Sequence, residues 1–550
     1  DWDRLGIIID DIDRIEVVRG ASGVAYGSNA FIGAINIVTR EPFANPGWRM
    51  TATSGSQDTS IASVQYAEMG DKFDYRVSAS YFHTDGFDDV NDHSTARTGR
   101  FQGHYQVTNN MGLDVQFGRS EGPWGRGEIG SPGSSDESKD AIEKFGNIRL
   151  TQTLSPGNEW HFQVGMNSTK ERDVINAGLL SELLGVSPAQ VPITTGGLLD
   201  QQVNGNIYNF TTNQLDVEFQ QLMQFDHGHR TVWGLGYRKD MHKGDATSRP
   251  GWGSFETYRA LGHMEYHLSG RTLLNVGVMY EDSDFNHGEF SYRVGLNFRL
   301  AKGHVVRASY ADSRRQPFVA EHLLDIASRL DDGTVVDQVE LTPEVLDSEH
   351  LRSYELGYVG SWLGGNLTTE VKIYREKFED EVEYTSDPTY PELSSSINPG
   401  AILLTSGGST DSRGIEMGIQ WQFTRQSKLW LSYAFSEVDQ HCMAHSFRCV
   451  TDNDATPRHT ASLLASHDFG RGWQTSFGYY YLDSMSWILW SDDIDSYDRV
   501  DMRLAKTINF SNSDLKVELI GQNLGGDYHE FSQNNVFETR TFVRATLQFH

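Results

Sequence analysis

Apolar and polar residues alternate strictly over many segments of about ten residues between Gly47 and Phe549, a pattern typical of transmembrane β-strands. In the segment 292–300 the apolar even positions are Tyr292, Val294, Leu296, Phe298 and Leu300, and the odd positions are Arg293, Gly295, Asn297 and Arg299. Segments 73–81, 367–373 and 542–549 alternate in the same way. One face of each predicted strand therefore suits lipid, and the other face suits water.

Compact turns and longer excursions follow one another along this region. Pairs such as Gly70-Asp71 and Gly364-Gly365 mark turns, whereas stretches such as 176–206 and 318–349 are much longer. This rhythm predicts about 22 strands, the size at which a barrel encloses a plugged lumen. A β-sandwich would alternate similarly but would not keep the rhythm over so long a region. We therefore predict an all-β fold, with an antiparallel transmembrane β-barrel over residues 47–550.

The composition agrees with a barrel in a membrane. No apolar stretch is long enough for a transmembrane helix, so a spanning chain must close into a barrel. Aromatic residues make up 11% of the chain, as interface girdles require. Asp and Glu number 75 against 46 Lys and Arg, a net charge of -29 that excludes a general nucleic-acid binder. We assign the excess of Asp and Glu residues to solvated loops.

The chain has two cysteines, Cys442 and Cys449, in one excursion between predicted strands. Two cysteines exclude a scaffold built on disulfides but allow one local bridge in an oxidising compartment, which we predict. His441 and His445 lie beside them, and this combination could also hold copper or haem iron. Acidic clusters elsewhere lack the Gly and the distal Glu of a calcium loop. We predict a disulfide and no metal site.

The stretch 12–40 differs from the rest of the chain. Its short alternating pieces are separated by glycines, including Gly20, Gly27 and Gly33, which suit turns that a strand cannot continue through. Small β-pieces joined in this way predict a compact insert. A phosphate-binding loop is excluded because neither G-x-G-x-x-G nor G-x-x-x-x-G-K-[ST] occurs here.

This stretch carries a family resemblance. Arg14-Ile-Glu-Val-Val-Arg-Gly20, Tyr26-Gly27 and Gly33-Ala-Ile-Asn-Ile37 resemble the closing segment of the plug domain of TonB-dependent outer-membrane receptors. The family's plug is longer than residues 1–42, so the resemblance implies that only its C-terminal part is present. A signal peptide and a TonB box are not visible before it, and we expect them in a missing first part.

Further motifs extend the resemblance over nearly the whole chain. They are Arg314-Arg-Gln-Pro317, Ser353-Tyr-Glu-Leu-Gly-Tyr358, Arg413-Gly-Ile-Glu416 and Gly521-Gln-Asn-Leu524. One departure is that His550 follows the final aromatic, Phe549, on which the family often ends.

The resemblance implies a receptor of the bacterial outer membrane that transports a metal chelate, first of all a ferric siderophore. Haem, cobalamin and other nutrients of the same family are the alternatives, and a passive porin is a further one that the plug segment argues against. The implied partners are the TonB energy-transducing complex, outer-membrane lipid and the iron chelate, with no covalently bound cofactor and a monomeric state. An enzyme is excluded, because no short motif sets a His beside a nucleophile.

The resemblance also implies an ion cluster between plug and barrel, formed by Arg19, Glu355 and Glu416. Strand parity agrees, because Tyr354 and Leu356 leave Glu355 on the inward face, and a carboxylate facing lipid would be costly. We expect Arg19 to lie between the two carboxylates in a buried cluster, whose loss in Arg19→Ala would cost ~3 kcal/mol or more.

Candidate ligand contacts are Arg314 and Arg315, at the top of a predicted strand, where arginine suits the oxygens of an anionic chelate. Pairing of these arginines with nearby acids is an equal alternative. Tyr26 and Asn29, in the plug segment, are further candidates. Which chelate is carried stays open at this point.

Overall fold

The computed structural model describes part of the 550-residue chain. The described residues are 5–87, 90–125, 138–172, 175–205, 209–244, 252–330, 332–387, 401–443, 446, 455–486, 493–530 and 535–550. Within some described helices and strands, only the backbone of certain residues is described, and these include Tyr26 and Asn29.

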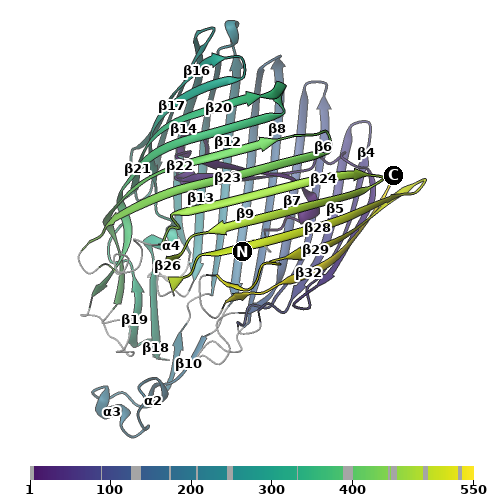
Figure 1. Cartoon of the computed structure of the whole chain (residues 1–550). Helices are drawn as coiled ribbons and strands as arrows, with labels where there is room; N and C mark the ends of the chain where they lie inside the picture. The colour runs from purple at the N-terminus through teal and green to yellow at the C-terminus, as the bar shows by residue number, and fades with distance from the viewer. Residues whose placement is uncertain are drawn as a thin grey trace.

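The main body is a closed antiparallel barrel of 22 strands, counted over the described residues (Figure 1). Its first strands are β3 (Gly47–Gly55), β4 (Ser60–Met69), β5 (Phe73–Thr84), β6 (Ser94–Thr108), β7 (Met111–Gly125), β8 (Ser138–Ser155), β9 (Asn158–Arg172), β12 (Phe210–Gln224), β13 (Arg230–Gly244), β14 (Gly253–Ser269) and β15 (Thr272–Ser283). The others are β16 (Glu289–Ala301), β17 (His304–Arg315), β20 (Glu349–Trp362), β21 (Leu367–Asp387), β22 (Ala401–Trp421), β23 (Ser427–His441), β24 (His459–Gly470), β25 (Trp473–Leu482), β28 (Tyr497–Asn509), β29 (Ser513–Gln522) and β32 (Arg540–Phe549). Pairing of β3 with β32 closes the sheet. The predicted fold class and strand number are confirmed.

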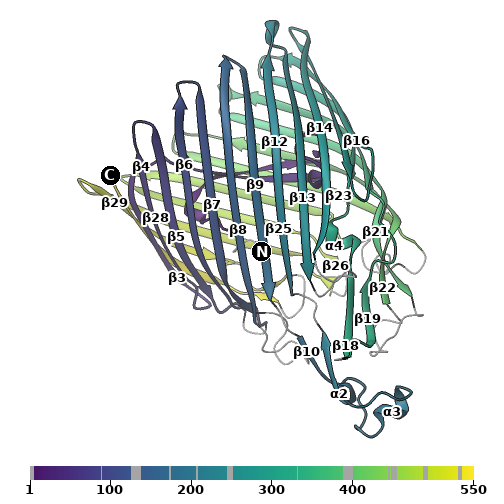
Figure 2. The same ribbon diagram turned by 180° about the vertical axis from the view of Figure 1, so that it is seen from behind.

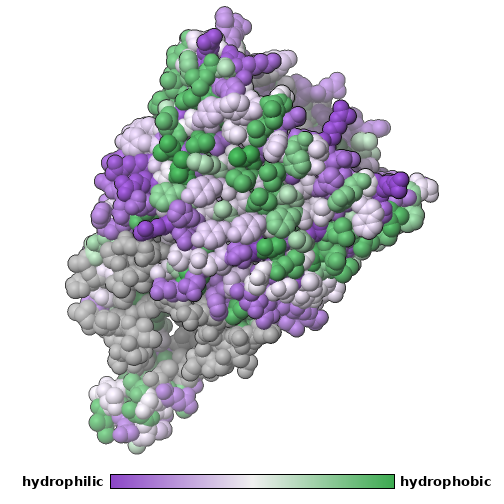
Figure 3. All heavy atoms as spheres, in the orientation of Figure 1, coloured by the Kyte–Doolittle hydropathy of each residue, from purple (hydrophilic) through white to green (hydrophobic). Residues whose placement is uncertain are grey.

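Side chains follow the predicted alternation. In β16, the apolar positions Tyr292, Val294, Leu296, Phe298 and Leu300 are all exposed on the outside. Their exposure follows from the fold, since in a barrel one face of every strand points away from the lumen. Figure 3 shows hydrophobic side chains across the outer surface of the barrel, with hydrophilic side chains gathered toward its ends.

The two ends of the barrel differ in the length of their strand connections. Compact turns such as 109–110 and 156–157 join strands at one end, which we call the short-turn end. Two of these turns contain the 3-10 helices η4 (Asp226–Gly228) and η5 (Leu363–Gly365). Longer connections, such as those between β9 and β12 and between β17 and β20, gather at the other end, which we call the long-loop end.

The long-loop end carries additional structure. Its elements are β10 (Ile175–Leu179), α2 (Leu180–Leu183), α3 (Val191–Thr194), β11 (Gln202–Gly205), α4 (Val319–His322), β18 (Asp325–Leu330) and β19 (Val335–Leu341), with the short pairs β26 (Met485–Ser486) with β27 (Asp493–Ile494) and β30 (Tyr528–His529) with β31 (Val536–Phe537). The part around α2, α3, β10, β18 and β19 projects beyond the barrel (Figures 1 and 2). Leu180, Val191, Val203, Leu330 and Val336 form a small core there. Among the described residues, none of the helices has the length and apolar character needed to cross a membrane.

Residues 5–42 lie inside the barrel (Figures 1 and 2). The 3-10 helix η2 (Ile9–Asp11) precedes β1 (Ile12–Arg19), followed by α1 (Gly23–Tyr26), η3 (Ser28–Ala30) and β2 (Gly33–Thr39). Strands β1 and β2 pair with each other in a separate antiparallel sheet, which we call the lumen hairpin. Figures 1 and 2 show this hairpin within the ring of barrel strands.

Candidate functional site in the barrel lumen

The turn after β1 brings the lumen hairpin close to the barrel. Gly20 has a φ of +88°, a conformation that favours glycine. A Cβ at this position would lie 2.5 Å from Oε1 of Glu355 on β20. The turn is held by the Gly20 amide, which donates to the Ile32 carbonyl at 3.0 Å, and by the Ser22 hydroxyl, which donates to the Gly20 carbonyl at 2.9 Å. A glycine here therefore allows the approach to the barrel.

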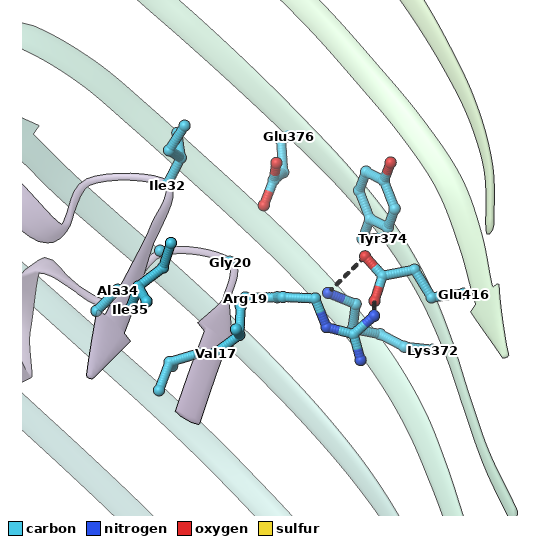
Figure 4. Close-up of a pocket in the computed structure, with 12 residues that line it drawn as sticks. Val17, Arg19, Gly20, Ile32, Ala34, Ile35, Lys372, Tyr374, Glu376 and Glu416 are labelled. Atoms are coloured by element: carbon cyan, nitrogen blue, oxygen red, sulfur yellow. Dashed lines mark ion pairs between the residues drawn. The ribbon is translucent and has the colours of Figure 1, made fainter. Parts of the chain in front are cut away.

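An ion cluster of Arg19, Glu355, Lys372 and Glu416 joins the hairpin to β20, β21 and β22, and Figure 4 shows its members Arg19, Lys372 and Glu416. Arg19 Nη1 lies 2.6 Å from Glu416 Oε2. Lys372 Nζ lies 3.3 Å from Glu416 Oε1 and 3.7 Å from Glu355 Oε1, so one ammonium serves both carboxylates. The Lys372 side chain is only 9% exposed, whereas that of Arg19 is 57% exposed. The buried cation of the cluster is therefore Lys372.

This arrangement differs in part from the expected one. The structure brings Arg19 to Glu416, but among the ion pairs of the described residues none joins Arg19 to Glu355. Glu355 instead pairs with Arg293 at 3.1 Å and accepts from the Ser309 hydroxyl at 2.8 Å. The expected burial of Arg19 is also not observed, because its side chain is more than half exposed. The expected cost of Arg19→Ala must be lowered accordingly.

Sequence reasoning missed Lys372 and Arg293. Both occupy inward positions of strands whose alternation is plain in the sequence, with Lys372 between Val371 and Ile373. Two inward carboxylates require a cation nearby, so the inward Lys and Arg residues of the neighbouring strands were the signal that could have identified this cation. The register places Lys372 directly opposite Glu416, which the sequence alone does not give.

A cavity of about 410 Å³ lies beside this cluster, between the hairpin and the barrel. Val17, Ile32 and Ile35 line its hairpin side, and the barrel side includes Tyr374 and Glu376 together with the ion cluster (Figure 4). The cavity thus has an apolar face and a charged face.

A second ion cluster holds the start of the N-terminal stretch against a different part of the barrel. Asp10 pairs with Arg544 of β32, lies 3.9 Å from Arg49 of β3, and accepts from the Ser63 hydroxyl of β4 at 2.9 Å. The Asp10 side chain is 6% exposed. These contacts tie η2 to three neighbouring barrel strands.

Asp11 is buried still more completely. Its carboxylate lies 3.5 Å from Arg100 Nη1 and 4.0 Å from Arg76 Nη1, and accepts from Gln65 at 3.0 Å and from Ser78 at 2.9 Å. Burial raises the pKa of Asp11 above its ordinary value, although Arg100, Ser78 and Arg76 each lower it. Sequence reasoning did not single out this cluster. A pair of acids placed before β1 was its only local signal.

A second cavity, of about 320 Å³, lies between Gly27 and Ser28 of the N-terminal stretch and the barrel strands β12 to β15. Its lining includes Arg238, Arg259, His242 and the aromatic residues Phe255 and Phe318. Arg238 pairs with Asp240 at 2.7 Å, and Arg259 pairs with Asp216 at 3.1 Å. Cations and aromatic rings therefore share one chamber on the side of the α4 loop.

The predicted ligand contacts Arg314 and Arg315 both lie beside acidic residues. Arg315 lies between Glu321 at 2.8 Å and Glu349 at 3.0 Å, and Arg314 lies 3.6 Å from Glu289. By alternation Arg314 shares the outward face of β17 with Tyr310, so only Arg315 is on the lumen side. The structure thus pairs both arginines with acids. The side chains of Tyr26 and Asn29, and the residue Cys449 of the predicted disulfide, lie outside the described part of the chain.

One group of possible metal ligands occurs in the described part of the chain. Ligand atoms of Asp58, His83 and Asp85, at the long-loop end, lie within 4.8 Å of one another. The two aspartates are exposed, and His83 Nε2 lies 3.3 Å from Asp85 Oδ1. The contact between His83 and Asp85 joins two of these three residues without a metal.

Comparison with known proteins gives consistent results. A family model described as "TonB dependent receptor-like, beta-barrel" matches residues 74–524. The structure resembles the ferric-catecholate import receptor Fiu of E. coli K12, with a TM-score of 0.72 and 14% identity over 98% of this chain and 86% of that one. It resembles the ferric enterobactin receptor PfeA of Pseudomonas aeruginosa with a TM-score of 0.73 and 13% identity, over 99% and 86%. The siderophore receptor PirA of the same species gives 0.71 and 15%, over 98% and 86%.

Proposed function

Because this chain belongs to the family of TonB-dependent receptors, we propose that it imports a ferric siderophore across the bacterial outer membrane. The long-loop end then faces the outside of the cell and the short-turn end faces the periplasm. Residues 1–42 are the C-terminal part of the plug domain, and residues 47–550 form the barrel. Transport is driven by the TonB complex, which acts on the plug.

The observation that carries this proposal is the lumen hairpin with the preceding η2, which two separate ion clusters hold to the barrel. A passive pore has no use for an insert fixed across its lumen at this cost in buried charge. A receptor that opens only when energy is supplied needs such an insert. The hairpin therefore favours gated import over diffusion.

The cavity between Gly27 and the barrel supports a chelate as the ligand. Arg238 and Arg259 offer guanidinium groups, which match carboxylate and catecholate oxygens. Phe255 and Phe318 offer apolar surface for the rings of such a ligand. This combination suits an anionic, aromatic iron chelate better than a neutral nutrient.

Growth tests the proposal. The full-length gene product is expressed in a strain that lacks siderophore receptors, and iron-limited growth is measured on catecholate and hydroxamate siderophores, haem and cobalamin. We expect rescue by a ferric siderophore. Arg259→Gln should weaken this rescue, whereas Lys239→Gln, on the outer face of β13, should leave it unchanged. If no iron source rescues growth, the proposal is contradicted. If only haem or cobalamin rescues growth, that nutrient replaces the siderophore as the proposed ligand.

A further inference from the structure

The outer face of β20 to β23 changes abruptly from apolar to charged. The strand register places Leu356, Ile373, Ile415 and Phe435 side by side in one row across the four strands. Leu356 and Ile373 are 53% and 52% exposed, as expected of residues that face lipid. This row is the last apolar row on this face toward the long-loop end.

The next row, two residues further along each strand, consists of Tyr354, Arg375, Arg413 and Glu437. Two residues of a strand span about 7 Å, and the headgroup layer on each side of a bilayer is about 5–8 Å thick. The arginine row therefore falls within the headgroup layer that adjoins the apolar row. Tyr354, which is 55% exposed, occupies the level at which tyrosines collect in membrane proteins.

Arg375 and Arg413 face each other directly across β21 and β22. Like charges at directly opposite positions destabilise a sheet unless something lies between them. Among the described residues each arginine has one acidic contact, Arg375 with Asp411 at 3.2 Å and Arg413 with Glu437 at 2.8 Å. Their side chains are 71% and 63% exposed, and a guanidinium has five N–H donors, so donors remain for an anion.

A cavity of about 490 Å³ opens at this place, lined by Arg375, Arg413, Arg458 and His441 together with Asp411 and Asp439. One row further from the apolar row, Asp411 and Asp439 lie opposite each other, and Lys377 and Arg352 continue this row across β21 and β20. The two facing arginines are therefore nearer to the apolar row than Asp411 and Asp439, which line the same cavity from the next row. This order matches a lipid whose phosphate is attached close to its acyl chains.

We propose that this outer-face cavity binds the phosphorylated head group of a lipid of the outer leaflet, with Arg375 and Arg413 as its main phosphate ligands. Arginine binds phosphate in a bidentate manner, and basic pockets on membrane proteins recognise lipid head groups in this way. The bound phosphate compensates the facing arginines, and the acyl chains lie along Ile373 and Ile415. The inference rests on the outer-membrane location in the proposed function, but it concerns a site outside the lumen.

The test uses the 550-residue chain folded in detergent, titrated with bisphosphorylated lipid A and with dephosphorylated lipid A of the same acyl composition. Binding is followed by native mass spectrometry. The double variant Arg375→Gln/Arg413→Gln is compared with Lys239→Gln. Lys239 is an outward cation on another side of the barrel, and it lies opposite a carboxylate, Glu256, at 2.6 Å rather than opposite a second cation.

We expect the unmodified chain and Lys239→Gln to prefer the bisphosphorylated lipid by about tenfold or more, and the double variant to lose this preference. Equal preference in the double variant would overturn the proposal. Displacement of the lipid by an equimolar amount of inorganic phosphate would also overturn it, because the site would then bind free phosphate. Heat-modifiable migration in gels shows that each variant is folded. Siderophore binding is measured on the same samples, so that loss of the lipid preference alone is distinguished from failure of the proposed function.

Discussion

The solvent exposure of each cation in the ion cluster between hairpin and barrel decides how much that cation contributes to hairpin docking. Arg19 is 57% exposed, so its pair with Glu416 is screened by solvent. We expect Arg19→Ala to lower the free energy of hairpin opening by about 1 kcal/mol or less. Hydrogen exchange of amides in 12–39 measures this opening.

Lys372 provides the comparison for that variant. Lys372→Met leaves Glu355 and Glu416 without their shared ammonium, and loss of one partner of a buried ion cluster costs about 3–5 kcal/mol. Urea unfolding of the folded barrel should show this larger loss. A larger effect of Arg19→Ala than of Lys372→Met would contradict this ranking.

Substitution of Gly20 tests whether hairpin docking depends on the close approach between hairpin and barrel. We expect Gly20→Ala to destabilise hairpin docking by about 1–3 kcal/mol, because a positive φ is strained for alanine and the new Cβ would meet Glu355. Arg293 and Ser309 hold that carboxylate, so it cannot simply turn away. Hydrogen exchange of β1 and β2 gives the readout. Gly418→Ala, where no atom lies within 4 Å of the added Cβ and φ is not positive, should have little effect on docking, and an equal effect of both changes would contradict the explanation.

At the scale of elements, the sequence predicted the barrel strands well and the lumen contacts only in part. Alternation fixes which residues of a strand face inward, so Glu355 and Glu416 could be placed on the lumen side in advance. Which inward residues meet depends on register and on the position of the hairpin, and neither follows from alternation. Lys372 was therefore missed although its parity was plain. The Asp10–Asp11 cluster was missed because alternation does not show where η2 lies against β3 to β6, and because its other partner strand, β32, is at the opposite end of the sequence.

The excursion after β23 carries the predicted disulfide between Cys442 and Cys449. A bridge that closes so short a loop should stabilise the loop locally by ~2 kcal/mol. We expect no free thiol in the unreduced, denatured chain, and faster proteolysis of this loop after reduction. Mass spectrometry of peptides before and after reduction identifies the bridge. Two alkylated cysteines in an unreduced sample would refute it.

The loop helix α4 should respond to pH through His322. This side chain is 7% exposed, stacks on Phe285 at 4.2 Å, and accepts from the Leu346 amide at 3.3 Å. Burial, aided by Arg315, lowers the pKa of His322 to about 4. Since the unfolded loop binds a proton at an ordinary pKa near 6.5, the unfolded state holds more protons between these values, and stability falls as the pH falls through this range.

We therefore expect the packing of residues 318–324 to weaken by about 2 kcal/mol between pH 7 and pH 5. Hydrogen exchange, corrected for the intrinsic effect of pH, measures this change. His322→Phe keeps an aromatic ring in the same apolar surroundings and removes the titrating group, so its pH dependence should disappear. The same pH dependence in both proteins would show that another group is responsible.

At the scale of the whole molecule, the N-terminal stretch is fixed to the barrel at two separate places. Asp10 and Asp11 bind to β3, β4, β5, β6 and β32, whereas Arg19 binds to β22, about a third of the barrel sheet away along the strand order. The two sites share no side chain, so their contributions should add. Release of one site leaves the hairpin tethered by the other.

Channel recordings in planar bilayers follow from this arrangement. Asp11→Asn leaves Arg76 and Arg100 without their buried carboxylate, a loss of about 3–5 kcal/mol, and should produce more frequent openings than Arg19→Ala. The double variant Asp11→Asn/Arg19→Ala should open more often than either single variant. If the two free-energy losses add, its increase in opening frequency is the product of the two single increases. Arg14→Ala is the matched control, because Arg14 pairs only with Asp13 and Glu16 of its own strand among the described residues, and its openings should equal those of the unmodified chain. If the double variant conducts no more than Asp11→Asn alone, the hairpin is held at one site, and Arg19 does not contribute to closing the lumen.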